Sequence, residues 1–204
     1  MAAWGMTARA GVIALATLAI GACAKKENFA ADTTAASSTM AATDTGMASS
    51  TNGATAVLSD ANIVWILDAA NLSDSAWGSI AATKGTSAQV REFGQRMMRD
   101  HHALRKQGQD LAKKLNLTPT PTADDSSQSV LQHANDMLNN TPKGKDFDKA
   151  YIDHEVEYHK AVLQTATTAM GAAQNAELKN LIQKAAPLIQ AHLDMAEKIQ
   201  KSMK

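Results

Sequence analysis

Two side chains that could bind a metal ion or move a proton lie in a segment that otherwise reads as the buried face of a helix. In FDKAYIDHEVEYHKAVLQTATTAM (147–170), apolar residues such as Ile152 and Ala169 share one face with Glu155 and His159 at 3.6 residues per turn. The ionisable pair is spaced by four residues, so the two side chains lie on adjacent turns. Because such a pair on a buried face needs a partner, a ligand or a hydrogen-bond network, it marks the first candidate site.

Three other ionisable side chains occupy apolar positions in neighbouring helical segments. His101 and His192 each take a place in an apolar stripe, and Asp74 lies in the middle of another. A single histidine on an apolar face is more often a hydrogen-bonded core residue than a ligand. Five such groups on four segments favour a shared site instead. The candidate metal ligands are therefore His101, Glu155, His159 and His192, with Asp74 as a further member.

Four long amphipathic helices would position these side chains. No window shows the alternation of a strand, and aromatic residues make up only 4% of the chain, which favours helix. The predicted fold class is all-α: an up-and-down four-helix bundle with a short extra helix between helices two and three. Apolar periodicity and helix start and stop signals place the long helices at about 59–84, 86–117, 146–170 and 176–202, and the short one near 130–138.

The rise of 1.5 Å per residue indicates which candidates can meet. With the turns at residues 85 and 173 at the same end of the bundle, the four core candidates span about 7 Å along its axis. Asp74 then lies about 7 Å below His101, and we expect it to join only if the helices shift or tilt.

Three imidazoles and one carboxylate are typical ligands of Zn, Cu, Ni or Fe(II), whereas Mg and Ca prefer oxygen ligands. With four protein ligands and no open position, a zinc ion would be structural rather than catalytic. The alternative is a metal-free structural or protein-interaction module of the cell envelope, in which the same groups pair with one another. An enzyme is least favoured, because the sequence shows no phosphate-binding loop and no nucleophile placed beside a histidine.

Other polar residues read as parts of the surface or of helix ends. We expect Asp100 and His102 to point away from the centre of their stripe, and His133 and His154 to be exposed. Asp148 lies near the start of its helix, where an acidic group interacts favourably with the helix dipole.

The N-terminus has the pattern of an export signal. Arg9 is the only charged residue before the apolar run 11–22, which is shorter than the roughly 20 residues that span a bilayer. The sequence IGAC, which ends at Cys23, resembles the lipobox of bacterial lipoproteins. That resemblance implies cleavage before Cys23 and a lipid on its sulfur. The alternative is ordinary cleavage after Ala24.

We therefore expect a lipoprotein-type signal peptide at 1–22, a disordered Ala/Ser/Thr-rich tether at 23–57 and a folded domain at 58–204. The tether would span roughly 30 Å as a coil. Because Ala24 rather than Asp follows the cysteine, the sorting pattern implies the periplasmic face of the outer membrane, with a soluble periplasmic protein as the alternative. Lys+Arg and Asp+Glu are both 20, so no nucleic-acid partner is expected.

Three motifs within residues 63–199 carry a resemblance to a known family. They are VREFGQRMMRDH ending at His101, FDxxY beginning at Phe147 and followed by His159, and Pro187-Leu188 followed by His192-Leu193. With these motifs the chain resembles exported bacterial ferritin-like proteins of unknown function, often labelled predicted outer membrane proteins. The resemblance implies a ferritin-like helical bundle behind an export signal, with no established activity. The family often carries Glu near position 74, where this chain has Asp74.

The sequence departs from the di-iron ferritins in its ligand spacing. Those enzymes take Glu from two helices and Glu-x-x-His from two others. The nearest arrangement here is Glu155-x-x-x-His159. This spacing argues against a ferroxidase.

Overall fold

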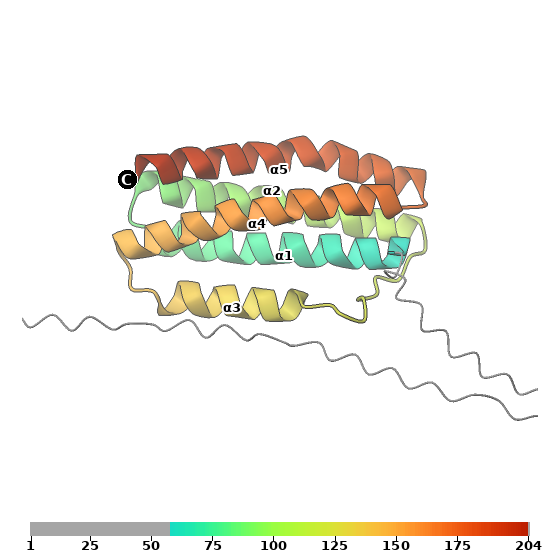
Figure 1. Cartoon of the computed structure of the whole chain (residues 1–204), viewed down its shortest axis with the longest axis horizontal. Coiled ribbons are helices and arrows are strands. Elements are labelled where there is room, and N and C mark those ends of the chain that lie inside the picture. The colour runs from blue at the N-terminus through green and yellow to red at the C-terminus, as the bar shows by residue number, and fades with distance from the viewer. Residues whose placement is uncertain (1–57, 204) are drawn as a thin grey trace, which may run out of the picture. The chain divides into compact units, whose positions relative to one another are not determined.

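The computed structural model describes residues 58–203, which form five α-helices and no strand (Figure 1). The all-α prediction and the short extra helix are confirmed. The predicted signal peptide 1–22, Cys23 and the tether 23–57 lie outside the described residues. None of the described helices is both long and apolar enough to cross a membrane. The helices are α1 (Asp60–Lys84), α2 (Ala88–Lys114), α3 (Ser127–Asn140), α4 (Lys145–Ala172) and α5 (Ala176–Ser202).

The helices begin where short polar side chains can accept hydrogen bonds from free backbone N–H groups. The Ser59 side chain accepts from the backbone N–H of Asn62 at the start of α1. Ser87 does the same for Val90 in α2, and the Asn175 side chain accepts two such bonds in α5. The caps at Ser87 and Asn175 end the short turns that follow α1 and α4, and each turn reverses the direction of the chain. The results are two helical hairpins, α1–α2 and α4–α5.

The two hairpin turns lie at opposite ends of the long helices (Figure 1). In the turn between α4 and α5, two backbone N–H groups donate to Asp60 at the start of α1, at 2.8 and 3.0 Å. In the turn between α1 and α2, two backbone N–H groups donate to Asp148 at the start of α4, at 2.8 and 2.7 Å. Consequently α2 and α4 run in the same direction, joined by the connection 115–144 that contains α3. The predicted up-and-down order, with both turns at one end, is wrong.

Asp60 and Asp148 therefore have reciprocal roles, because each aspartate binds the turn of the hairpin to which it does not belong. Asp148 is 5% exposed and accepts a third hydrogen bond from the Thr86 hydroxyl, at 2.6 Å. It lies in the first turn of its own helix, as expected, and the structure shows that it also accepts three hydrogen bonds from the turn before α2. The two aspartates fix how far one hairpin can slide along the other.

Two facing glycines bring α1 and α2 close together. A Cβ atom added to Gly78 would lie 2.6 Å from the carbonyl oxygen of Gly94, and one added to Gly94 would lie 2.7 Å from the carbonyl oxygen of Gly78. Both neighbouring atoms belong to the backbone, so neither can move aside easily. Asp74 and His101 lie about one to two turns from this contact on the same two helices.

The buried apolar residues form two clusters, one toward each end of the long helices. The first includes Trp77, Phe93 and Tyr151, and the second includes Ile63 and Ile182. On each of the four long helices, a buried ionisable side chain lies between the residues that belong to the first cluster and those that belong to the second. α3 packs against α1 and α4, outside the four long helices.

Candidate metal centre

All five candidate ligands lie at one level of the interior. From the end that carries the turn at residue 85, each is 10 to 14 residues along its own helix. Each is at most 1% exposed. Asp74 lies at the level of the others, with its Oδ2 atom 3.5 Å from His101 Nδ1. The expected offset of Asp74 from His101 is therefore wrong. The turn between α1 and α2 extends over residues 85–87, so the two residues differ by only three positions along their helices, about 4.5 Å, and their side chains cross this gap.

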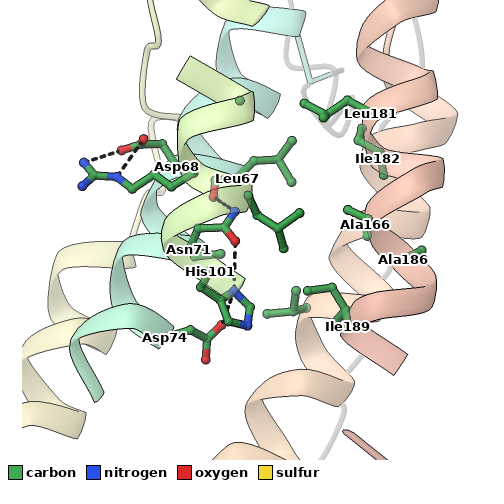
Figure 2. A pocket seen from close by; sticks show the side chains of 16 residues that line it. Leu67, Asp68, Asn71, Asp74, His101, Ala166, Leu181, Ile182, Ala186 and Ile189 are labelled. Atoms are coloured by element: carbon green, nitrogen blue, oxygen red, sulfur yellow. Dashed lines mark hydrogen bonds and ion pairs between the residues drawn. The ribbon is translucent and has the colours of Figure 1, made fainter. Parts of the chain in front are cut away.

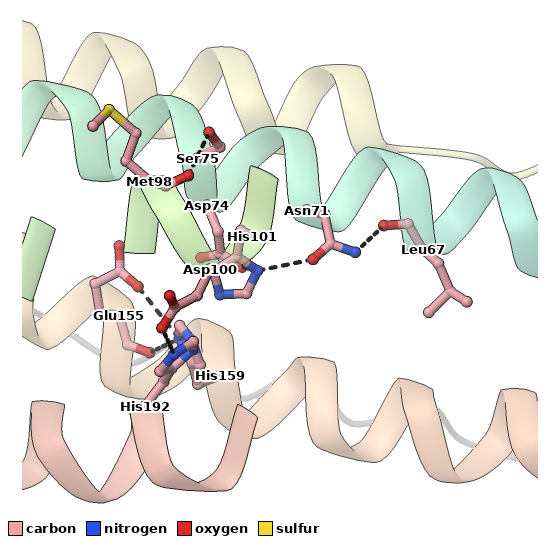
Figure 3. Close-up of polar contacts among 10 residues, drawn as sticks. All are labelled: Leu67, Asn71, Asp74, Ser75, Met98, Asp100, His101, Glu155, His159 and His192. Carbon is pink, nitrogen blue, oxygen red and sulfur yellow. Dashed lines mark hydrogen bonds and ion pairs between the residues drawn. The ribbon is translucent and has the colours of Figure 1, made fainter. Parts of the chain in front are cut away.

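The imidazoles of His101, His159 and His192 lie together between the helices (Figure 3), and their centroids form a nearly equilateral triangle. The ring centroids of His101 and His192 are 5.1 Å apart, and those of His159 lie 5.5 Å from His101 and 5.6 Å from His192. Each ring offers a nitrogen within 4.8 Å of a nitrogen on each of the others. Ligand atoms that share a metal ion lie at most about 4 Å apart, since each metal–nitrogen bond is about 2 Å long, so the three rings lie near the spacing of a shared site.

A side-chain amide fixes the proton on His101. Asn71 Nδ2 donates to the carbonyl oxygen of Leu67 at 2.7 Å, which orients the amide so that Oδ1 faces the ring. His101 Nδ1 lies 2.9 Å from this oxygen and must donate to it. The proton is therefore on Nδ1, and the lone pair of the neutral ring is on Nε2.

His159 is held by its own helix. Its Nδ1 atom lies 3.0 Å from the backbone carbonyl oxygen of Glu155, which can only accept. This bond also leaves Nε2 with the lone pair in the neutral ring. His192 has the opposite arrangement, because Nε2 lies 3.0 Å from Asp100 Oδ2 and donates to that carboxylate. Its lone pair is on Nδ1.

The three nitrogens that carry the lone pairs are the ones left without a partner. His101 Nε2, His159 Nε2 and His192 Nδ1 are all buried and make no hydrogen bond within residues 58–203. In metalloproteins, a hydrogen bond from the second ring nitrogen typically fixes the tautomer and orientation of a ligating histidine. All three imidazoles have that arrangement here.

Two buried carboxylates form a second group around His159. Asp74, Glu155 and His159 each offer a ligand atom within 4.8 Å of the other two. Glu155 Oε2 lies 3.3 Å from His159 Nδ1. The side-chain oxygens of both acids accept no hydrogen bond from the described part of the chain. The predicted ligand set is thereby divided into two groups of three that share His159.

Tyr151 lies one turn before Glu155 on the same face of α4. Its ring packs between Phe93 and Phe147, with centroids 6.1 and 6.5 Å away, and the residue is fully buried. Burial raises the pKa of Tyr151 well above its usual value, and the charges of Glu155 and Asp74 raise it further. Its hydroxyl oxygen has no hydrogen-bond partner among the residues described.

Burial and mutual charge set the protonation of the cluster. Burial lowers the pKa of His159, but Asp74 and Glu155 raise it more strongly, to about 9. Burial raises the pKa of Asp74 well above its ordinary value, and nearby Glu155 adds to this although His159 opposes it. Burial, with the charges of His159 and His192, lowers the pKa of His101. In the absence of a metal ion, both ring nitrogens of His159 are therefore protonated near neutral pH, and the ring is positively charged.

An apolar cavity of about 50 Å³ lies next to His101, between the two hairpins (Figure 2). Leu67, Ile182 and Ile189 line it, with Asn71 and Asp74 at the end that holds the imidazole. The hydrogen bond between Asn71 and His101 lies at this end of the cavity.

Sequence reasoning missed two residues of this centre. Asp100 was expected to point away, but its carboxylate binds His192; the signal was its place directly before a predicted ligand. Asn71 lies one turn from Asp74 on α1, and the sequence indicated no role for it. His154 was expected to be exposed, but it is half-buried, with its ring edge-on to Trp77 at 4.5 Å. His102 and His133 are exposed, as predicted.

These features define an all-helical domain with histidines and carboxylates clustered in its interior. The chain belongs to the family described as "Domain of unknown function (DUF4142)", which matches residues 42–199. The match includes most of the described helices and begins within the predicted tether. No match was found among curated proteins or among solved structures.

Proposed function

We propose that this protein binds a divalent transition metal ion in its interior through His101, His159 and His192. One observation carries the proposal: each imidazole has one nitrogen held by a hydrogen bond and the other buried without a partner in the described structure. Three neutral imidazoles suit Zn²⁺, Cu²⁺ or Fe²⁺. With three protein nitrogens the ion would keep an open position, rather than the closed four-ligand site expected from the sequence.

A metal-free network explains the same residues less well. Leaving a buried polar atom unpaired costs about 1–3 kcal/mol, and in this cluster the three imidazole nitrogens and the oxygens of both acids make no hydrogen bond within residues 58–203. A bound ion would satisfy the three nitrogens at once. The metal-free module stays the alternative, supported by the ion pair between His159 and Glu155.

We also propose that the fold is a ferritin-like four-helix bundle anchored at the periplasmic face of the outer membrane. The support for the fold is the single long connection between α2 and α4, which is the connectivity of ferritin-like bundles. The support for the anchor is the sequence before Cys23. Mass spectrometry of the purified protein tests the anchor, since lipidation adds acyl chains at Cys23 and cleavage after Ala24 removes that residue.

Metal retention tests the proposed function. We expect the protein, loaded with Zn²⁺ and desalted, to keep at least one zinc ion per chain. The double variant His101→Ala, His192→Ala should keep one ion fewer, while the exposed His102→Ala and His133→Ala control should match the unmutated protein. Circular dichroism verifies that the variants are folded. Less than one zinc ion per unmutated chain, or equal retention by the double variant, contradicts the proposal.

A further inference from the structure

We propose that Asp74 and Glu155 hold a second divalent cation beside the imidazole site, so that the interior is a two-ion centre. This inference extends the proposed metal-binding function and rests on it. It concerns the second group of ligand atoms, which includes these two carboxylates and the ring of His159.

The two carboxylates lie on the far side of the imidazoles from the free ring nitrogens. Asp74 Oδ2 is 3.5 Å from His101 Nδ1, and Glu155 Oε2 is 3.3 Å from His159 Nδ1. Both of these nitrogens are the protonated ones. An ion bound to the Nε2 atoms of the same rings is therefore separated from the carboxylates by the rings, and the five residues do not converge on one point.

The burial of the two carboxylates favours a bound cation. Asp74 and Glu155 are both 0% exposed, and their four oxygens accept no hydrogen bond from the part of the chain that the structure describes. Taking two such groups out of water is costly unless a proton or a cation compensates them. Among the described residues neither carboxylate pairs with a lysine or an arginine, and their ion-pair contacts are with the imidazoles of His101 and His159, at 3.5 and 3.3 Å.

A third oxygen is available at the same place. The Tyr151 hydroxyl is buried near both carboxylates, and it too lacks a partner within residues 58–203. The rings of Phe93 and Phe147 hold it in position. Two carboxylates and a phenol oxygen form an oxygen-rich set, which suits Mn²⁺ better than the neighbouring imidazoles do.

A sequential loading experiment tests the second ion. The protein is first loaded with one equivalent of Zn²⁺ to fill the imidazole site and is then titrated with Mn²⁺. Because bound Mn²⁺ loses the sharp electron paramagnetic resonance signal of the free ion, the loss of signal counts bound ions. We expect one Mn²⁺ per zinc-loaded chain. The Asp74→Asn, Glu155→Gln double variant should bind none and still retain one zinc ion.

The retained zinc shows that the variant is folded and that its imidazole site is intact. Asp68→Asn is the matched control, since Asp68 also lies on α1 but pairs with Arg105 at 3.0 Å and is half-buried. This control should bind Mn²⁺ as the unmutated protein does. If zinc-loaded protein binds no Mn²⁺, or the double variant binds it equally well, the second ion is refuted and the carboxylates serve only to orient the imidazoles. Failure of zinc retention in the unmutated protein refutes the first site instead.

Discussion

His159 Nδ1 lies 3.0 Å from the backbone carbonyl oxygen of Glu155, one helical turn earlier in α4. A carbonyl oxygen only accepts, so this contact fixes the proton on Nδ1 and leaves Nε2 for another partner. Because the carbonyl belongs to the same helix, the ring is oriented by local geometry rather than by a distant side chain. The orientation of His159 is thus set within α4.

The pH dependence of metal binding follows from His159. Its pKa is about 9 in the folded, metal-free protein, above the ordinary value of 6.5. The raised pKa stabilises the metal-free fold below pH 6.5, and this contribution is lost as the pH rises through 9. A metal ion must displace the proton, so binding is weakened wherever His159 is protonated. We expect the rise in melting temperature on adding Zn²⁺ to be larger at about pH 8.5 than at about pH 6. Equal rises at both pH values would contradict this linkage.

Substitutions of Asn71 test whether its side-chain amide orients the ring of His101. Asn71→Ala removes the acceptor for Nδ1, so His101 loses the bond that fixes its tautomer. We expect zinc affinity to fall by about 10- to 100-fold, the usual effect of removing such a supporting partner. Asn71→Asp keeps an acceptor and should restore most of the affinity. Competition with a chelating dye measures the affinities, and Asn71→Ala affinity equal to that of the unmutated protein would show that the amide does not orient the ring.

The contact between Gly78 and Gly94 predicts a large effect from one methyl group. Gly94→Ala pushes a Cβ atom against backbone atoms of α1, and we expect it to destabilise the fold by about 1–3 kcal/mol. Gly108→Ala is the matched control in the same helix, since no atom lies within 4 Å of its added Cβ. It should stabilise by roughly 0.5–1 kcal/mol, because alanine favours helix over glycine. Urea unfolding measures both, and similar effects from the two variants would contradict the close approach.

Asp148 should contribute more to the stability of the fold than Asp146, which lies in the same first turn of α4. Asp148→Ala removes three hydrogen bonds to the turn before α2, and we expect a loss of about 2 kcal/mol, or about 4–8 °C in melting temperature. Asp146→Ala is the control, because Asp146 is exposed in the same first turn. If the stabilisation came only from the dipole of α4, the two variants would melt alike.

The sequence predicted the helices and the buried polar residues because both follow from local periodicity. The positions of Glu155, His159, His101 and His192 on apolar faces were sufficient to select them. The direction of α4 could not be predicted, since it depends on how far the connection 115–144 runs along the helices. The offset of Asp74 from His101 depended instead on the exact length of the turn between α1 and α2, which local periodicity does not give. Asp100 and Asn71 were missed because their partners are on other helices.

The X-ray absorption spectrum of the protein loaded with one equivalent of Zn²⁺ tests the imidazole site most directly. The three lone-pair nitrogens of His101, His159 and His192 predict three imidazole ligands at about 2.0 Å, visible through scattering from the outer atoms of the rings. The three-imidazole signal should be absent from the His101→Ala, His192→Ala variant, which is expected to lose this ion. A zinc shell without imidazole scattering, or one that the double variant leaves unchanged, would contradict a metal site at this triangle of histidines.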